Sequence, residues 1–334
     1  MSRGKRAAAR SRSRCGSPAD LDSCFFQREC RLCSIDGQES HSACGGRIRS
    51  PVVRRGQLSG GLRRCQQWRA AVGGVPSTRD LVHPERSQRW LIRSAQVHIP
   101  AKARAGTLLP VVLVLHGAGG TGRGMAEWTH FSAVADAMNF IAVYPNATGK
   151  SRFWTLRDHR GAANDVQFIS DLLDQLEANP CVDQSRIYAT GVSNGGGMTA
   201  RIGCELSGRI AAIAPVAGGY RSLPPCDATR PLSVLEVHGT GDPVVPYLGL
   251  PPDFAGSVPT YLAGWTQRDG CAAVPSRQEI ARRTLLKTWS GCAPGVAVQH
   301  LELYGFGHGW PDTIGANGPT TARWIWSFLA SKRN

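Results

Sequence analysis

The chain has 334 residues, of which 42% are hydrophobic, enough to bury the core of one large domain. Its formal net charge is +15, but residues 1–75 hold 15 Lys and Arg against 5 Asp and Glu, so only +5 remains for residues 76–334. That main part has no basic stripe interleaved with aromatic residues, which argues against a nucleic-acid partner. No apolar run approaches the roughly 20 residues of a membrane-spanning helix, so we predict no membrane span.

The N-terminal segment, residues 1–75, is rich in Arg, Ser, Gly and Cys and lacks any helical or strand period, which predicts a disordered basic tail. Its Cys30, Cys33, His41 and Cys44 have the ligand types and pair spacing of a small zinc knuckle. Six scattered cysteines in an aperiodic segment instead favour sequence translated upstream of the true start. We therefore predict no metal site and, since no apolar h-region follows the basic N-terminus, no signal peptide there.

Residues 76–88 are expected to be a linker, and residues 89–334 a single domain in which strands alternate with helices. This alternation predicts an α/β fold with a mostly parallel, doubly wound sheet. The predicted strands are residues 90–99 (an edge strand or hairpin), 108–115, 140–144, 187–190, 210–216, 232–238 and 296–304. The predicted helices are residues 125–138, residues 165–176, a helix through residues 198–202, and a closing helix over residues 322–329.

A glycine-rich loop, His116-Gly117-Ala118-Gly119-Gly120, follows the continuously apolar strand at residues 108–115. Such a loop at the end of a central strand leaves backbone N–H groups free to bind a negatively charged oxygen. Phosphate binding is the rival interpretation, but the Gly-Lys-Ser/Thr sequence of a phosphate-binding loop is absent. The loop is therefore a candidate source of an oxyanion donor.

The pentapeptide Gly191-Val192-Ser193-Asn194-Gly195 lies between a predicted strand and a predicted helix. Glycines flanking a serine permit a sharp strand-to-helix turn that exposes the hydroxyl at the carboxyl end of the strand. The helix that follows directs its free N–H groups toward the same point. Ser193 is thus the candidate nucleophile, against the alternative of a glycine-rich loop with a chance serine.

Two further candidates, Asp242 and His308, also lie just after predicted strands. Asp242 follows strand 232–238, and His308 follows strand 296–304 between two glycines. The chain order Ser193, Asp242, His308 is that of a nucleophile, an acid and a base in α/β-hydrolases. His116 and His238 compete for the role of base, but both lie at strand ends where histidines often fix loops, and His116 comes too early for this order.

Five motifs occur in one order: Leu115-His116-Gly117-Ala118-Gly119-Gly120, Asn164-Asp165-Val166-x-Phe168-Ile169, Thr190-Gly191-x-Ser193-Asn194-Gly195-Gly196, His238-Gly239-Thr240-x-Asp242-x-x-Val245-Pro246-Tyr247 and Gly307-His308-x-Trp310-Pro311. Together they resemble the polyhydroxybutyrate-depolymerase-like esterases, over about Arg89 to Leu329. This family has the α/β-hydrolase fold and is related to the feruloyl and acetylxylan esterases of carbohydrate esterase family one.

The resemblance implies a secreted serine esterase that needs no cofactor and forms an acyl-enzyme. Its ester substrate, oligomeric or polymeric, would be a polyhydroxyalkanoate oligomer or an acyl or feruloyl ester of a plant polysaccharide. The oxyanion donors would be the backbone N–H groups of Ala118 and Asn194. Two alternatives remain: an acyltransferase of the mycolyltransferase type, with an alcohol as acceptor, and a non-catalytic module on a degenerate scaffold.

Trp154, Phe306 and Trp310 are the candidate pocket residues. Phe306 stands in a loop where the family usually has a run of glycines, so we expect it to narrow the pocket. The connection between residues 210 and 232 is short, and no other strand is followed by a long helical insertion, which predicts no large lid. No Thr- or Ser-rich linker or polymer-binding domain follows the closing helix, so we expect little attack on insoluble polyester.

The cysteines outside the tail predict the redox compartment. Cys271 and Cys292 each follow a glycine and bracket a strand-like segment, so we expect them to form a disulfide. Cys181 and Cys204 are a second candidate pair, for which Cys226 competes with Cys181. A Cys271–Cys292 disulfide, together with the family resemblance, predicts an extracellular protein. The alternative is a cytoplasmic enzyme in which all five cysteines are reduced.

Overall fold

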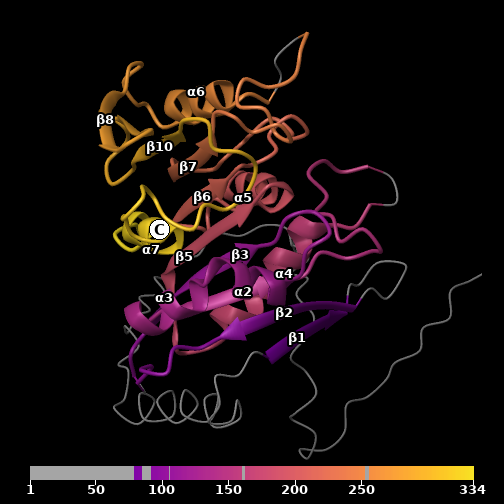
Figure 1. Cartoon of the computed structure of the whole chain (residues 1–334). Helices are drawn as coiled ribbons and strands as arrows, with labels where there is room; N and C mark the ends of the chain where they lie inside the picture. The colour runs from indigo at the N-terminus through magenta and orange to yellow at the C-terminus, as the bar shows by residue number, and fades with distance from the viewer. Residues whose placement is uncertain (1–78, 85–91, 105, 160–161, 253–255) are drawn as a thin grey trace, which may run out of the picture. The chain divides into compact units, whose positions relative to one another are not determined.

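The computed structural model describes residues 79–84, 92–104, 106–159, 162–252 and 256–334. All of these belong to the second of two units into which the chain divides, residues 53–334. In this unit a central sheet carries helices on both faces (Figure 1). The predicted tail and the cysteines of the zinc-knuckle hypothesis lie outside the described residues.

Ten strands form the sheet within the described residues, in the order β1-β2-β4-β3-β5-β6-β7-β10-β9-β8. The six strands from β4 to β10 run parallel, and an antiparallel pair flanks them on each side. The strands are β1 (Arg79–Pro84), β2 (Ile92–His98), β3 (Leu109–Leu115), β4 (Ile141–Pro145), β5 (Val182–Val192), β6 (Ala212–Val216), β7 (Ser233–Gly239), β8 (Ser276–Ala281), β9 (Thr284–Trp289) and β10 (Val298–Leu303).

Two large apolar clusters, one on each face of the sheet, make up most of the core, and a smaller third cluster contains Val258 and Leu262. In β3, Val111 and Leu113 pack into the cluster that contains Phe168 of α4, whereas Val112 and Val114 pack into the other. A strand buried on both faces explains why this stretch is continuously apolar. The helices are α2 (Gly122–Thr129), α3 (Phe131–Met138), α4 (Asp165–Glu177), α5 (Asn194–Glu205), α6 (Val258–Arg268) and α7 (Thr321–Leu329).

The distribution of helices over the two faces confirms the predicted doubly wound sheet. Side chains of α4, α5 and α6 belong to the first cluster and those of α2, α3 and α7 to the second. Residues 217–232, between β6 and β7, contain no helix. This connection is therefore not a large helical lid, as we expected. Within the part of the chain that is described, no helix is both long and apolar enough to span a bilayer.

The register of the parallel strands brings their carboxyl ends to one edge of the sheet. Leu115 lies opposite Gly191, Val192 opposite Val216, and Leu303 opposite Gly239. The loops that follow β3, β5, β7 and β10 therefore meet, as ligand-binding loops do in open parallel sheets.

The helix predicted over residues 125–138 is in fact two helices, because the chain turns at His130. This residue has a left-handed conformation, with φ 53° and ψ 24°. The Thr129 hydroxyl donates to the carbonyl of Met125 at 2.7 Å, a side-chain bond that competes with continuation of the helix. The apolar periodicity runs across this break, so the pattern alone suggested one helix.

The structure also contains strands that the sequence did not reveal. β1 lies inside residues 76–88, which we expected to be a linker, and pairs with β2 from Arg79 opposite Val97 to Pro84 opposite Ile92. β8 has the polar sequence Ser-Arg-Gln-Glu-Ile-Ala and is largely exposed. Flanking strands of this kind are stabilised by backbone pairing to a neighbour, which leaves little hydrophobic alternation in the sequence.

Two disulfides are present in the described residues. Cys271–Cys292 confirms the predicted bridge, and Cys204–Cys226 is the pairing that competed with Cys181–Cys204. Cys204 lies in the last turn of α5 and Cys226 in the irregular connection before β7, with their Cα atoms 5.5 Å apart. This separation suits a disulfide, so Cys204 is not the partner of Cys181.

Removing the Cys271–Cys292 disulfide should measurably destabilise the protein. The two cysteines are 21 residues apart, so we expect the Cys271→Ser/Cys292→Ser double variant to lose about 3 kcal/mol of unfolding free energy, because the unfolded chain regains loop entropy. Guanidinium denaturation of oxidised protein measures this loss. The reduced wild type serves as control, and equal stability of variant and oxidised wild type would contradict the expectation.

Candidate active site

Ser193 occupies the sharp turn between β5 and α5 in a backbone conformation that side-chain-bearing residues rarely adopt. Its φ is 58° and its ψ is −121°. Its N–H donates to the carbonyl of Val216 at 2.9 Å, and its own carbonyl accepts from Gly197 and Gly219 at 2.9 and 3.3 Å. These bonds hold the serine at the carboxyl edge of the sheet with its side chain only partly buried.

The two glycines of the pentapeptide are required by close backbone contacts. A Cβ at Gly191 would lie 2.6 Å from the carbonyl oxygen of Gly195 and 2.7 Å from that of Leu115. A Cβ at Gly195 would overlap the carbonyl oxygens of Leu115 and His116. Only glycine lets the turn lie directly against the end of β3.

His308 connects the other two candidates through hydrogen bonds. Its Nε2 lies 2.8 Å from Oγ of Ser193, and its Nδ1 lies 2.7 Å from Oδ2 of Asp242. A carboxylate accepts only, so Nδ1 carries the proton and Nε2 is left to accept the serine hydroxyl proton. The structure therefore brings together the three residues that the sequence pointed to, from the loops after β5, β7 and β10.

Asp242 is fixed from two sides. Its Oδ1 accepts from the backbone N–H groups of Val244 and Val245, each at 2.8 Å, while Oδ2 faces His308 and His238. Burial favours the neutral acid, but the hydrogen bonds from the two histidines and the backbone outweigh it and lower the pKa of Asp242 to about 2. The carboxylate is thus ionised at neutral pH.

His116, one competitor for the role of base, is a structural residue. Its Nε2 accepts from the backbone N–H of Ala147 at 3.0 Å, so its Nδ1 donates to the carbonyl of Gly117 at 2.7 Å. Burial lowers the pKa of His116, which favours this neutral form. Both ring nitrogens are occupied in fixing the loop after β3, and neither is available to Ser193.

His238, the other competitor, lies behind Asp242 and not beside Ser193. Its Nδ1 is 2.9 Å from Oε1 of Glu236, and its Nε2 is 2.9 Å from the carbonyl oxygen of Val245 and 3.3 Å from Oδ2 of Asp242. Glu236 was not predicted from the sequence, although a glutamate inside the apolar run of β7 indicates a buried charge that needs a partner.

The two expected oxyanion donors lie on the loops that border Ser193. Among the described residues, no acceptor is bonded to the backbone N–H of Ala118 or of Asn194. A Cβ at Gly117 would be 3.5 Å from Cβ of Ser193, so the loop after β3 lies against the serine. Both N–H groups are therefore available at the correct edge of the sheet.

The side chain of Asn194 ties this region to Trp154. Its Oδ1 accepts from the Trp154 N–H at 2.7 Å, and its Nδ2 donates to the Trp154 carbonyl at 3.0 Å. The Trp154 indole N–H in turn donates to the carbonyl of His116 at 2.9 Å. Trp154, predicted as a pocket residue, is fully buried. Its hydrogen bonds connect the turn at Asn194 to the loop that begins at His116.

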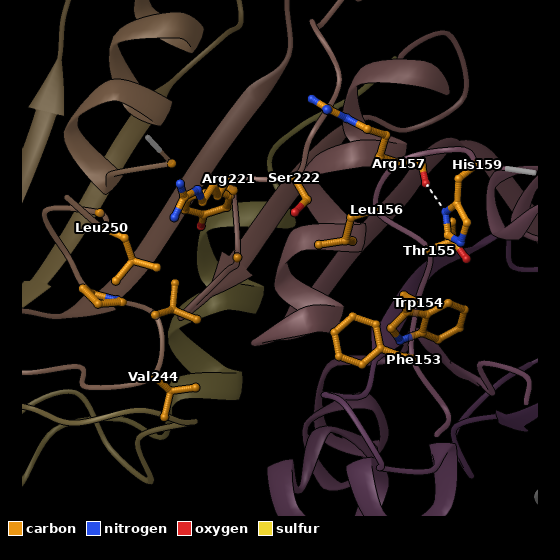
Figure 2. A pocket seen from close by; sticks show the side chains of 16 residues that line it. Phe153, Trp154, Thr155, Leu156, Arg157, His159, Arg221, Ser222, Val244 and Leu250 are labelled. Atoms are coloured by element: carbon orange, nitrogen blue, oxygen red, sulfur yellow. Dashed lines mark hydrogen bonds between the residues drawn. The ribbon is translucent and has the colours of Figure 1, made fainter. Parts of the chain in front are cut away.

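A cavity of about 740 Å³ adjoins these loops. Figure 2 shows Phe153 and Leu156 on one side of it and Val244 and Leu250 on the other. The cavity also borders Gly219 and Val245, which bond Ser193 and Asp242 respectively. It could receive part of a substrate. Trp154, a predicted pocket residue, also lines it, whereas Phe153, Leu156, Val244 and Leu250 were not predicted as pocket residues.

The other two predicted pocket residues are not part of this cavity. Phe306, about one third exposed, borders a separate hollow of about 470 Å³ next to Arg282 and Asp312. Trp310 is buried in the second apolar cluster and meets the ring of Phe131 edge to face, with 6.3 Å between centroids. The motif spacing located the histidine between them but gave no information on where the neighbouring rings pack.

No group of three or more His, Cys, Asp or Glu residues suited to a metal ion occurs in the ranges described above. The doubly wound sheet, the strained serine and the hydrogen-bonded histidine and aspartate define an α/β-hydrolase. Comparison with known proteins gives the family. The family described as Esterase PHB depolymerase matches residues 94–245.

Individual relatives agree with this family. A probable feruloyl esterase C of Aspergillus clavatus is 30% identical over 230 residues, which are 64% of this chain and 75% of that protein. A bifunctional acetylxylan esterase/xylanase of Neocallimastix patriciarum is 29% identical over 215 residues, 64% of this chain and 30% of that protein. The chain belongs to the PHB depolymerase family of esterases, which are carboxylic ester hydrolases.

A solved structure adds the fold. That of an acetyl xylan esterase from Aspergillus awamori matches with a TM-score of 0.54 and 15% identity, over 76% of this chain and 99% of that chain. At this identity the likeness shows the fold alone, which is the predicted α/β-hydrolase fold. The chain spans less than a third of the length of the bifunctional relative.

The depressed pKa of Asp242 predicts a pH-dependent contribution to stability. The folded-state pKa of about 2 lies below the ordinary value of 3.8, so the contribution is fully present above pH 4 and is lost as the pH falls toward 2. We expect the difference in unfolding free energy between wild type and Asp242→Asn to shrink by about 2 kcal/mol between pH 5 and pH 2. Urea denaturation at several pH values measures it, and a pH-independent difference would contradict the assignment.

Proposed function

We propose that the protein hydrolyses carboxylic esters, with Ser193 as nucleophile, His308 as general base and Asp242 as the group that orients the imidazole. The hydrogen-bonded chain from Asp242 through His308 to Ser193 carries this proposal. Membership of an esterase family supports it. The strained turn at Ser193 adds to that support, because strain of this kind persists where it serves a site.

The proposed reaction has two halves. As Ser193 Oγ attacks the ester carbonyl, His308 Nε2 takes the hydroxyl proton and then passes it to the leaving alcohol, giving an acyl-serine. A water molecule then attacks the acyl carbonyl, His308 takes its proton, and the proton returns to Ser193 as the acid leaves. In both halves the backbone N–H groups of Ala118 and Asn194 would stabilise the negative carbonyl oxygen, aided by the N-terminus of α5.

For the substrate we propose an ester with a bulky or chain-like part, such as a polyhydroxyalkanoate oligomer or an acetyl or feruloyl ester of a plant polysaccharide. The names of the two relatives favour the polysaccharide esters. The cavity at Phe153 and Val244 offers apolar walls for one part of such an ester. The same names favour water as acceptor over the alcohol of an acyltransferase.

We also propose that the protein works outside the reducing cytosol. The disulfides Cys204–Cys226 and Cys271–Cys292 support this, since such bridges persist in oxidising compartments. Residues 1–75 are proposed to be dispensable for catalysis, because the hydrogen bonds that build the site join residues from His116 to His308.

Substitution of the candidate residues tests the mechanism. Ser193→Ala and His308→Ala should each lower kcat/KM for p-nitrophenyl acetate and methyl ferulate by roughly 10⁴-fold or more, because nucleophile and base act as a unit. Asp242→Asn should leave a measurable trace. Ser276→Ala, on the exposed strand β8, is the matched control and should keep wild-type turnover. Wild-type turnover in Ser193→Ala would refute the proposal.

A further inference from the structure

A buried, charged cluster on β7 is in contact with Asp242. Glu236 and His238 are neighbours on the same face of β7, two residues apart, and their side chains are completely buried. Buried ionisable groups are costly unless each is paired. Neither residue can touch a substrate, so their presence beside the site calls for a role exerted through Asp242.

The hydrogen-bond partners of His238 determine its charge. Nδ1 faces a carboxylate oxygen of Glu236 at 2.9 Å, and Nε2 faces the carbonyl oxygen of Val245 at 2.9 Å and Oδ2 of Asp242 at 3.3 Å. All three partners can only accept, so both ring nitrogens must donate. A ring with a proton on both nitrogens is an imidazolium cation.

This cation differs from His116, the other competitor for the role of base. The Nε2 of His116 faces a backbone N–H and therefore accepts, which leaves that ring neutral. For His238, burial lowers the pKa, but the charge of Glu236 and the bonds to Asp242, Glu236 and Val245 raise it to about 10. Glu236 is its counterion: burial opposes ionisation, but His238 and His300 lower its pKa to about 2.

The cluster is completed by groups from neighbouring elements. The Tyr220 hydroxyl donates to Oε1 of Glu236 at 2.9 Å, and Nδ1 of His300 on β10 lies 2.7 Å from Oε2. The Tyr247 ring centroid lies 6.0 Å from that of His238, and its hydroxyl lies 3.0 Å from Nε2 of His300. The titratable groups around His238 are thus Glu236, Asp242 and Tyr247 directly, with His308, His300 and Tyr220 one step further.

We propose that His238, anchored by Glu236, is a positioning residue whose imidazolium holds Asp242 ionised and turned toward His308. This inference rests on the proposed function of Ser193, His308 and Asp242. Oδ2 of Asp242 contacts Nε2 of His238 and Nδ1 of His308. The positive charge of His238 therefore offsets part of the carboxylate charge that acts on His308. The carboxylate that faces His308 therefore carries less uncompensated negative charge than an aspartate with no cation beside it.

The variant His238→Gln separates charge from hydrogen bonding. Its side-chain N–H₂ can still donate toward Asp242, but the positive charge is gone. The acid limb of the kcat/KM profile for p-nitrophenyl acetate should move to higher pH by about one unit, a tenfold loss on that limb, with the plateau nearly unchanged. Glu236→Gln, which removes the counterion, should move the limb in the same direction by less.

His300→Gln is the matched control, because His300 is equally buried and contacts Glu236 but not Asp242. The acid limb of the kcat/KM profile of His300→Gln should stay at the wild-type pH, even if this variant is less stable than the wild type. An unmoved limb in both His238→Gln and Glu236→Gln would overturn the inference, as would an equal shift in His300→Gln. Because a buried variant can fail to fold, the charge of His238 is also measured in the wild type.

That measurement is ¹⁵N NMR of histidine-labelled wild-type protein. One ring, whose signals are lost in His238→Gln or displaced in Glu236→Gln, should keep protons on both nitrogens up to about pH 9. Loss of one proton near pH 6.5 would overturn the inference. This readout does not depend on turnover, so an inactive wild type would refute the proposed ester hydrolysis while leaving the protonation of His238 measurable.

Discussion

The close approach of the β5–α5 turn to the end of β3 is the constraint on which the rest of the structure depends. Carbonyl oxygens of Leu115 and Gly195 come so near to Gly191 that no side chain fits there. This contact forces Ser193 into its left-handed conformation and aims its hydroxyl out of the sheet edge. The same contact sets the loop after β3 against the serine, so one packing contact positions both the candidate nucleophile and the N–H groups proposed as oxyanion donors.

The second organising feature is electrostatic and belongs to β7 and the loop after it. This stretch carries Glu236, His238 and Asp242, an alternation of negative, positive and negative charge that runs from the buried interior to the site. Each charge is matched by the next, so the stretch can place a carboxylate under His308 without leaving an unpaired ion in the core. A strained backbone turn thus positions Ser193, whereas a row of buried, alternating charges positions Asp242.

The sequence was sufficient for the fold class and for locating the three residues that the structure brings together, because these depend on local signals. Continuous apolar runs marked the buried parallel strands, and glycines marked the turn at Ser193. Features that depend on distant partners were not visible: β1 and β8 are polar strands held by backbone pairing, and His130 breaks a helix inside an unbroken apolar period. Likewise Trp154 and Trp310 were recognised as residues near the motifs, but their burial follows from packing between elements far apart in the chain.

The central claim is that Ser193 is activated by His308 and attacks an electrophilic carbonyl. Covalent labelling tests it most directly: the intact protein is treated with a fluorophosphonate, which phosphonylates activated serines, and the adduct is located by peptide mass spectrometry. One adduct per chain is expected, on the peptide that contains Ser193, with labelling suppressed in His308→Ala because the serine then lacks the base 2.8 Å from its hydroxyl. Labelling at another residue, or equal labelling of Ser193 without His308, would contradict the account.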